Sequence, residues 1–323
     1  MPVTYSYAFQ EDLAANFREV VNSKPREQAF EGSPTLKLLL KKPKKLQGNY
    51  IHVNVSHVGT PTGGVVTEAG TLATNSVESG KVAQFEPALY AEAGRLSHLQ
   101  RMKTGGSKAL FNRWMFELEQ ARLRLMKKIA QELWTTSQTA SGLFPIQVAI
   151  PADNTTGTYG LNRATYSWWR NYSATGVGAF TSNGYDAMDL ASLGVQVDGG
   201  EGVDLWVTEK AIFQKMKKAA RSTTNFEPHY KGKWEKRLSD FGIEAISFEG
   251  KPVIWDPYIA ASTGKIFGWR EDSFYLALYQ DFETGPVRSL EPSGVLADIA
   301  FVSFGAQLVT EEPRRTLQLS GLS

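Results

Sequence analysis

The sequence predicts an α+β fold, in which helices and strands mix without the regular spacing of βαβ units. Three observations support this. Residues 107–136 carry apolar side chains at helical spacing, residues 274–318 are mostly strand-like, and residues 143–272 combine short strands, loops and a helix. We therefore expect one long helix, a mixed central region and a returning set of strands.

The composition is that of a folded protein with a large core. Hydrophobic residues make up 42% of the 323 residues, and the formal net charge of +2 gives no reason to expect a nucleic-acid or membrane binder. The chain has no cysteine, which excludes disulfides, thiolate nucleophiles and cysteine metal ligands. No apolar run reaches the roughly 18 residues that span a bilayer, and the N-terminus lacks a signal-peptide pattern. We expect a soluble protein that stays where it is made.

The first elements predicted are an N-terminal helix and a long hairpin. Phe9, Leu13 and Phe17 are four residues apart, which is one face of a short amphipathic helix. Polar residues and a proline follow it, so we expect this helix to dock outside its own lobe. Apolar and polar side chains then alternate over residues 49–58, and a second extended run covers residues 81–90.

The hairpin raises a stability problem. Its two strands flank residues 59–80, which are rich in Gly, Thr, Ser and Glu. Loops longer than about 12–15 residues are uncommon in compact domains and tend to be functional. An isolated two-stranded hairpin is only marginally stable in water. Such an arm needs a surface to lie on, and this chain offers no obvious one.

Residues 107–136 are predicted to form the longest helix. At 1.5 Å per residue, a helix of roughly 30 residues is about 45 Å long, so it serves as a spine. The residues of its apolar stripe are Phe111, Trp114, Met115, Leu118, Leu125, Ile129 and Leu133.

The central region is predicted to be loop-rich up to residue 202. A strand at residues 204–209 then leads into a helix at 209–220, and residues 243–257 indicate a hairpin that turns at Gly250. Later strands are expected at residues 265–269, 274–278, 287–290 and 296–310.

Residues 160–171 are the most distinctive segment. They place large aromatic side chains beside arginines, which are the residue types that anchor protein contacts and buried polar joints. We interpret the segment as a junction between lobes or a contact between subunits, and a sugar-stacking platform is the alternative. The residues concerned are Arg163, Tyr166, Trp168, Trp169 and Arg170.

No local motif for catalysis accompanies them. The four histidines lack metal-binding spacing, and there is no nucleophile elbow, phosphate-binding loop or dinucleotide fingerprint. We therefore predict no enzyme activity, no cofactor and no metal. The histidines are His52, His57, His98 and His229.

A basic stretch runs from residue 210 to 237, with nine basic residues against two acidic ones, a local net charge of +7. It is either a surface for phosphate or an acidic neighbour, or a solvated helix face. The basic residues on the predicted helix are Lys210, Lys215, Lys217, Lys218 and Arg221.

The order of these elements resembles the major capsid proteins of tailed bacteriophages, which have the Hong Kong 97-like fold. Residues 160–171 look like a phrase common in that family after the spine helix, and residues 305–315 are similar to family C-termini. The resemblance implies a non-enzymatic subunit that forms the pentamers and hexamers of an icosahedral shell around packaged double-stranded DNA. It also implies either a separate scaffolding protein or an already processed chain, together with a portal, no membrane partner, and assembly in the host bacterial cytoplasm.

The resemblance further implies a division of the chain. The parts are an N-terminal arm at 1–33, a peripheral domain at 34–142 and 273–323 with an extended loop at about 47–93, and an axial domain at 143–272. The expected contact residues outside residues 160–171 are Phe9, Leu13, Phe17, Tyr50, Ile51, Val53, Val82 and Phe85. The basic helix would face either DNA or a neighbour's carboxylates. The alternatives are an encapsulin-like compartment shell, a polysaccharide-binding or hydrolysing protein, and a nucleic-acid-binding protein that acts through residues 210–237.

Overall fold

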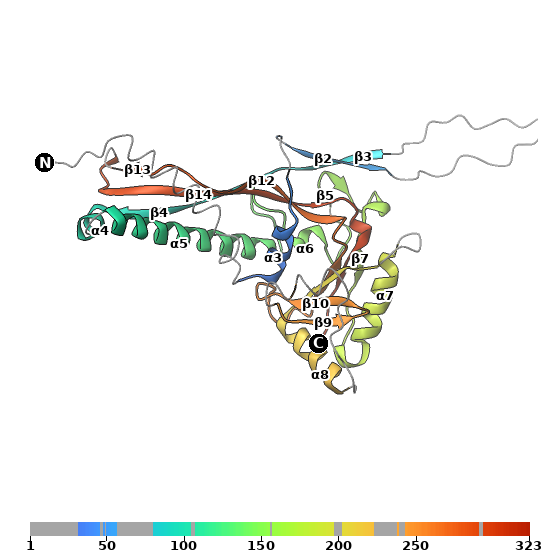
Figure 1. Ribbon diagram of the computed structural model, residues 1–323. Coiled ribbons are helices and arrows are strands. Elements are labelled where there is room, and N and C mark those ends of the chain that lie inside the picture. The colour runs from blue at the N-terminus through green and yellow to red at the C-terminus, as the bar shows by residue number, and fades with distance from the viewer. Residues whose placement is uncertain are drawn as a thin grey trace, which may run out of the picture.

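The α+β prediction is confirmed by a computed structural model, in which an elongated platform carries a wedge-shaped part below it and a two-stranded ribbon at one end (Figure 1). The N-terminal contacts predicted at Phe9, Leu13 and Phe17 lie outside the described residues. The structure describes residues 32–45, 48, 50–56, 80–104, 107–155, 157–196, 202–222, 238, 243–290 and 293–323.

The platform is a five-stranded sheet. Its longest strand, β14, pairs antiparallel with β12 and, near its start, with β13 along one edge, and with β4 along the other. The strands are β1 (Lys44–Lys45), β4 (Ala88–Ser97), β12 (Phe274–Thr284), β13 (Arg288–Ser289) and β14 (Ala297–Thr310). Short helices border the sheet, namely α3 (Pro34–Lys41), α4 (His98–Lys103) and α6 (Ile146–Ala149).

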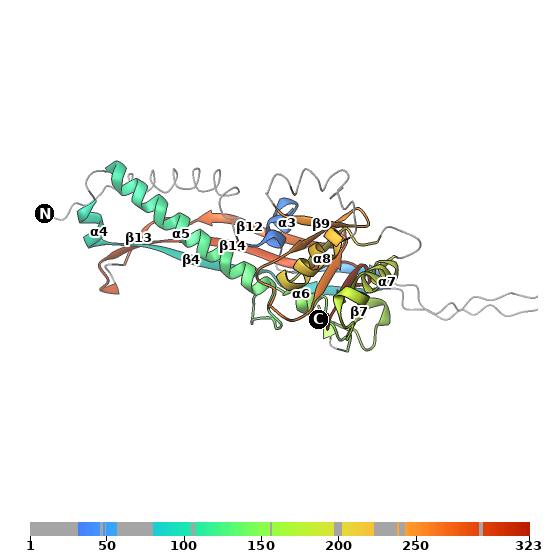
Figure 2. The same cartoon turned by 90° about the horizontal axis from the view of Figure 1, so that it is seen from below.

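The predicted spine helix is α5 (Ser107–Leu133), which runs along β4 and β14 (Figure 2). Leu118, Leu125 and Ile129 are almost completely buried against the sheet, as the apolar stripe predicted. Gly94 of β4 lets the helix approach closely, since an added Cβ there would lie 3.3 Å from the Leu118 side chain. Burial of this one stripe therefore fixes the helix on the platform.

The wedge contains a six-stranded sheet. Apolar side chains of α7 (Tyr185–Val195) and α8 (Lys210–Ser222) share a core with one face of this sheet. In order across the sheet, the strands are β7 (Tyr172–Ala174), β15 (Thr316–Leu319), β11 (Ile266–Trp269), β8 (Leu205–Thr208), β10 (Lys251–Trp255) and β9 (Ala245–Phe248). The hairpin predicted within residues 243–257 is confirmed, with Gly250 at φ +74° in its turn.

Two features of this region differ from what the sequence led us to expect. Residues 273–323 were assigned as a whole to the peripheral domain, but β15 pairs with β11 and β7 of the six-stranded sheet. The short 3₁₀ helix Pro313–Arg315 separates it from the platform strands, and all four residues of β15 are buried, as in an interior strand. The region up to residue 202 was predicted to be loop-rich, yet it contains α7 and the π-helix Phe180–Gly184 that precedes it.

Candidate functional site

The aromatic segment lies between the small hairpin of β5 (Gly157–Thr158) and β6 (Leu161–Asn162) and strand β7. Trp169 ends the 3₁₀ helix Ser167–Trp169 and is fully buried in the core that joins the platform to the six-stranded sheet. Trp168 is half-buried, and its ring meets that of Trp169 edge-on, at 69° with 6.0 Å between the centroids. Two rings in this arrangement provide no flat sugar-stacking platform, because one is hidden and the other is tilted.

Arg163 forms a buried polar joint beside Trp169. Its guanidinium donates to the Ala149 carbonyl at 2.6 Å and to Asn171 Oδ1 at 3.0 Å. Asn171 in turn donates to the carbonyl oxygens of Pro151 and Tyr172, both at 3.0 Å. Burial lowers the pKa of Arg163 to about 10, because the charged form has lost its water. The network ties the loop after α6 to the start of β7.

Arg163 and Trp169 are therefore internal. Both side chains have no exposed surface, so neither is available for direct contact with another copy. Tyr166, Trp168 and Arg170 are partly exposed, and Arg170 donates to the carbonyl oxygens of Arg163 and Ala164. The structure thus divides the segment into two buried residues and three at the surface.

Replacement of Arg163 with Met should lower the free energy of unfolding by about 2–3 kcal/mol, because Asn171 Oδ1 and the Ala149 carbonyl each lose their buried donor. Arg170→Met is the matched control, since that side chain is only half-buried, and we expect a smaller effect. Urea unfolding of the unassembled protein measures both. Equal losses for the two variants would contradict the role given to Arg163.

The base of the long hairpin is fastened beside this joint. Strands β2 (Ile51–Ser56) and β3 (Gly80–Phe85) pair antiparallel from Ile51 opposite Phe85 to Ser56 opposite Gly80. The centroids of the Phe85 and Tyr159 rings are 4.0 Å apart. The backbone N–H of Gln84 donates to the Tyr159 carbonyl at 3.1 Å. Further out, the Lys81 ammonium lies 5.7 Å from the Tyr166 ring centroid.

The predicted hairpin contacts differ in burial. Ile51 and Phe85 are buried at the base, Val53 is half-buried, and Tyr50 and Val82 are 46% and 51% exposed. The connection between the strands, residues 57–79, lies outside the described part of the chain. The described ribbon therefore has a buried base and an outer face that carries apolar side chains.

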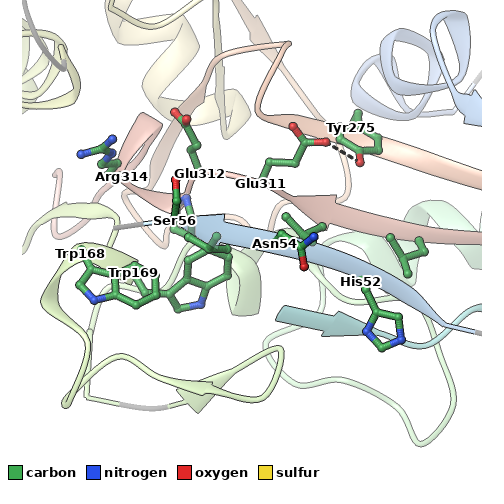
Figure 3. Close-up of a pocket in the computed structure, with 13 residues that line it drawn as sticks. His52, Asn54, Ser56, Trp168, Trp169, Tyr275, Glu311, Glu312 and Arg314 are labelled. Atoms are coloured by element: carbon green, nitrogen blue, oxygen red, sulfur yellow. Dashed lines mark hydrogen bonds between the residues drawn. The ribbon is translucent and has the colours of Figure 1, made fainter. Parts of the chain in front are cut away.

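A cavity of about 920 Å³ lies between β2, the two tryptophans and residues 311–314 (Figure 3). The Tyr275 hydroxyl donates to Glu311 Oε1 at 2.8 Å, and Lys44 pairs with the same carboxylate oxygen at 2.8 Å. The Glu311 carboxylate on this wall is thus already bound within the subunit.

The basic helix is amphipathic. Ile212, Phe213 and Met216 pack into the core, whereas Lys210 and Lys218 are exposed. Lys215 is half-buried, Lys217 pairs with Glu244, and the Lys210 ammonium lies 5.8 Å from the Trp255 ring centroid. The side chain of Arg221 and the basic residues at 231–237 lie outside the described part.

Sequence reasoning missed two residues that hold the parts together. Tyr159 adopts φ +56° and is buried between Phe85 and Phe144, and Gly160 after it was the only local signal for this turn. Asp256 is fully buried and accepts hydrogen bonds from the Ser33 hydroxyl at 2.5 Å and the Thr35 amide at 3.3 Å. Ser33 and Thr35 are more than 200 positions away from Asp256 in the sequence, so no local pattern predicts this contact.

Within the described ranges, no three His, Asp or Glu side chains are arranged to hold a metal ion. The helices that the structure describes include none with the length and apolar character needed to cross a membrane.

Comparison with known proteins gives the fold. The sequence matches no protein-family model and no curated protein. The structure is similar to a chain of the cyanophage A-1(L) capsid, with a TM-score of 0.70 and 17% identity over 91% of this chain and 94% of that one. It is also similar to a chain of Mycobacterium phage Bobi (TM-score 0.54, 11% identity, 90% of both chains). The encapsulin SrpI of Synechococcus elongatus gives a TM-score of 0.53 and 10% identity over 88% and 87% of the two chains. The predicted Hong Kong 97-like fold is confirmed.

Proposed function

We propose that this chain is the major capsid protein of a tailed bacteriophage, a non-enzymatic subunit that assembles into the pentamers and hexamers of an icosahedral head around double-stranded DNA. The observation that carries the proposal is the similarity to the cyanophage capsid chain over nearly the whole length of both proteins. A separate scaffolding protein, a portal and assembly in the bacterial cytoplasm belong to the same proposal.

The long hairpin supports this function on physical grounds. Its described strands pair only with each other, and Tyr50 and Val82 are exposed although they are large and apolar. A two-stranded ribbon gains stability when a further surface covers one of its faces. In a shell, the neighbouring subunit supplies that surface, and many weak contacts of this kind are multiplied over a closed lattice.

An encapsulin-like compartment is the second candidate, because the Synechococcus encapsulin shares the fold over a similar share of its length. The nucleic-acid content of the particles separates the two functions. A phage head fills with double-stranded DNA when portal and packaging machinery are present, and a compartment shell does not.

The direct test is electron microscopy and sedimentation of the purified, expressed protein. We expect shells, tubes or isolated pentamers and hexamers. A monodisperse monomer at all concentrations would overturn the proposal, and the polysaccharide alternative would be favoured if that monomer hydrolysed a glycan.

A further inference from the structure

One helix of the wedge presents apolar side chains that the described part of the subunit leaves exposed. Leu190 and Leu193 of α7 are 62% and 55% exposed. Asp186 and Asp189 are also exposed and lie on the same side of the helix, since the four positions are spaced by three, one and three residues. The opposite side of α7, with Met188 and Val195, is fully buried. We name the exposed side the acidic face.

A second helix of the wedge presents the opposite charge. Lys210, Lys217 and Lys218 fall on one side of α8, at spacings of seven and one, while Phe213 and Met216 pack inward. We name this side the basic face. Figure 1 shows α7 along one flank of the wedge and α8 at its lower end, and the Tyr185 hydroxyl of α7 donates to the Met216 carbonyl of α8 at 3.3 Å.

We propose that the acidic face of one subunit packs against the basic face of the next copy. This inference rests on the proposed function and specifies which surfaces of the wedge meet. Complementary potentials favour this pairing, and a pairing of like faces would bring carboxylates against carboxylates or lysines against lysines. Because the two faces differ, the contact is heterologous, and a heterologous contact closes into a ring when its rotation is the right fraction of a turn.

The exposed leucines of α7 favour a second copy of the chain over DNA as the partner of the basic face. The alkyl stems of Lys210 and Lys218 provide apolar surface that covers Leu190 and Leu193 while the ammonium groups reach the aspartates. Glu249 adds a carboxylate at the acidic face, where it accepts a hydrogen bond from Ser192 of α7 at 3.2 Å. Binding of DNA by the basic face would leave the two leucines of α7 exposed to water.

Charge reversal tests the pairing. Asp186→Lys with Asp189→Lys, and Lys210→Glu with Lys218→Glu, should each raise the concentration needed for assembly by at least about tenfold, because each variant brings like charges together. The quadruple variant restores opposite charges across the contact and keeps the net charge of +2. We expect it to assemble at close to the wild-type concentration, measured by sedimentation and electron microscopy.

Lys127→Glu with Lys128→Glu is the matched control. It changes the net charge by the same amount as Lys210→Glu with Lys218→Glu, but on the exposed side of α5. We expect it to assemble at close to the wild-type concentration. If the wild type assembles and either reversal has no effect, or the quadruple variant is not rescued, the inference is wrong and the proposed function stands. If Lys210→Glu with Lys218→Glu assembles normally but retains less nucleic acid, the basic face binds DNA and the pairing is refuted. A wild type that never assembles overturns the proposed function and this inference with it.

Discussion

Trp169→Ala should lower the free energy of unfolding by about 3–5 kcal/mol, which is the range for removal of a large aromatic side chain from a core. Trp169 has no exposed surface and belongs to the core that joins the platform to the six-stranded sheet. The cavity left by the indole would open where the two parts meet, so we expect little folded subunit and no assembly. Urea unfolding of the unassembled protein gives the magnitude.

Trp168→Ala is the control that the sequence itself provides. The two residues are adjacent and identical, but Trp168 is half-buried and lies at the edge of the cavity beneath β2. Its loss should cost well under half as much, and the variant should remain folded. Equal losses for the two variants would show that the burial difference does not control stability at this joint.

The sequence predicts best those elements whose own pattern determines them. The apolar stripe of α5 and the strand character of β14 are visible locally, because each element buries one continuous face against the platform. Helix α7 was missed because Gly184 precedes it and Gly194 lies near its end, and both residues weaken a helical pattern. It is held by packing on the six-stranded sheet, which involves residues far away in the chain.

The sequence predicted what kind of site this is, but not which of its residues are buried. Aromatic residues next to arginines indicated a buried joint, but nothing in the sequence shows that Trp169 is hidden while Trp168 is at the surface. The position of β15 was equally out of reach, since Leu317 and Leu319 have the same strand pattern whichever sheet receives them. Strand partners depend on long-range packing, which local periodicity does not encode.

Removal of residues 59–78, which leaves a three-residue connection between Ser56 and Gly80, should abolish shell closure and leave the subunit folded. The hairpin is fastened to its own chain at the base, through Phe85 against Tyr159 and the Gln307 side chain bound to the Glu86 carbonyl. These contacts remain in the shortened protein, so its urea unfolding curve should match that of the wild type. The shell loses the contacts that we propose the long hairpin makes with a neighbouring subunit. Sedimentation should therefore show unassembled subunits or small oligomers.

A variant in which residues 59–78 are replaced by Gly and Ser at equal length separates reach from side-chain chemistry. If the arm acts by spanning a distance to the next subunit, this variant should still assemble, whereas the deletion should not. If it acts through its side chains, both variants should fail, because a Gly/Ser chain provides length without apolar anchors. Closed shells from the deletion variant at wild-type yield would refute the role of the arm, and the base of the hairpin would then supply all the contact that the lattice needs.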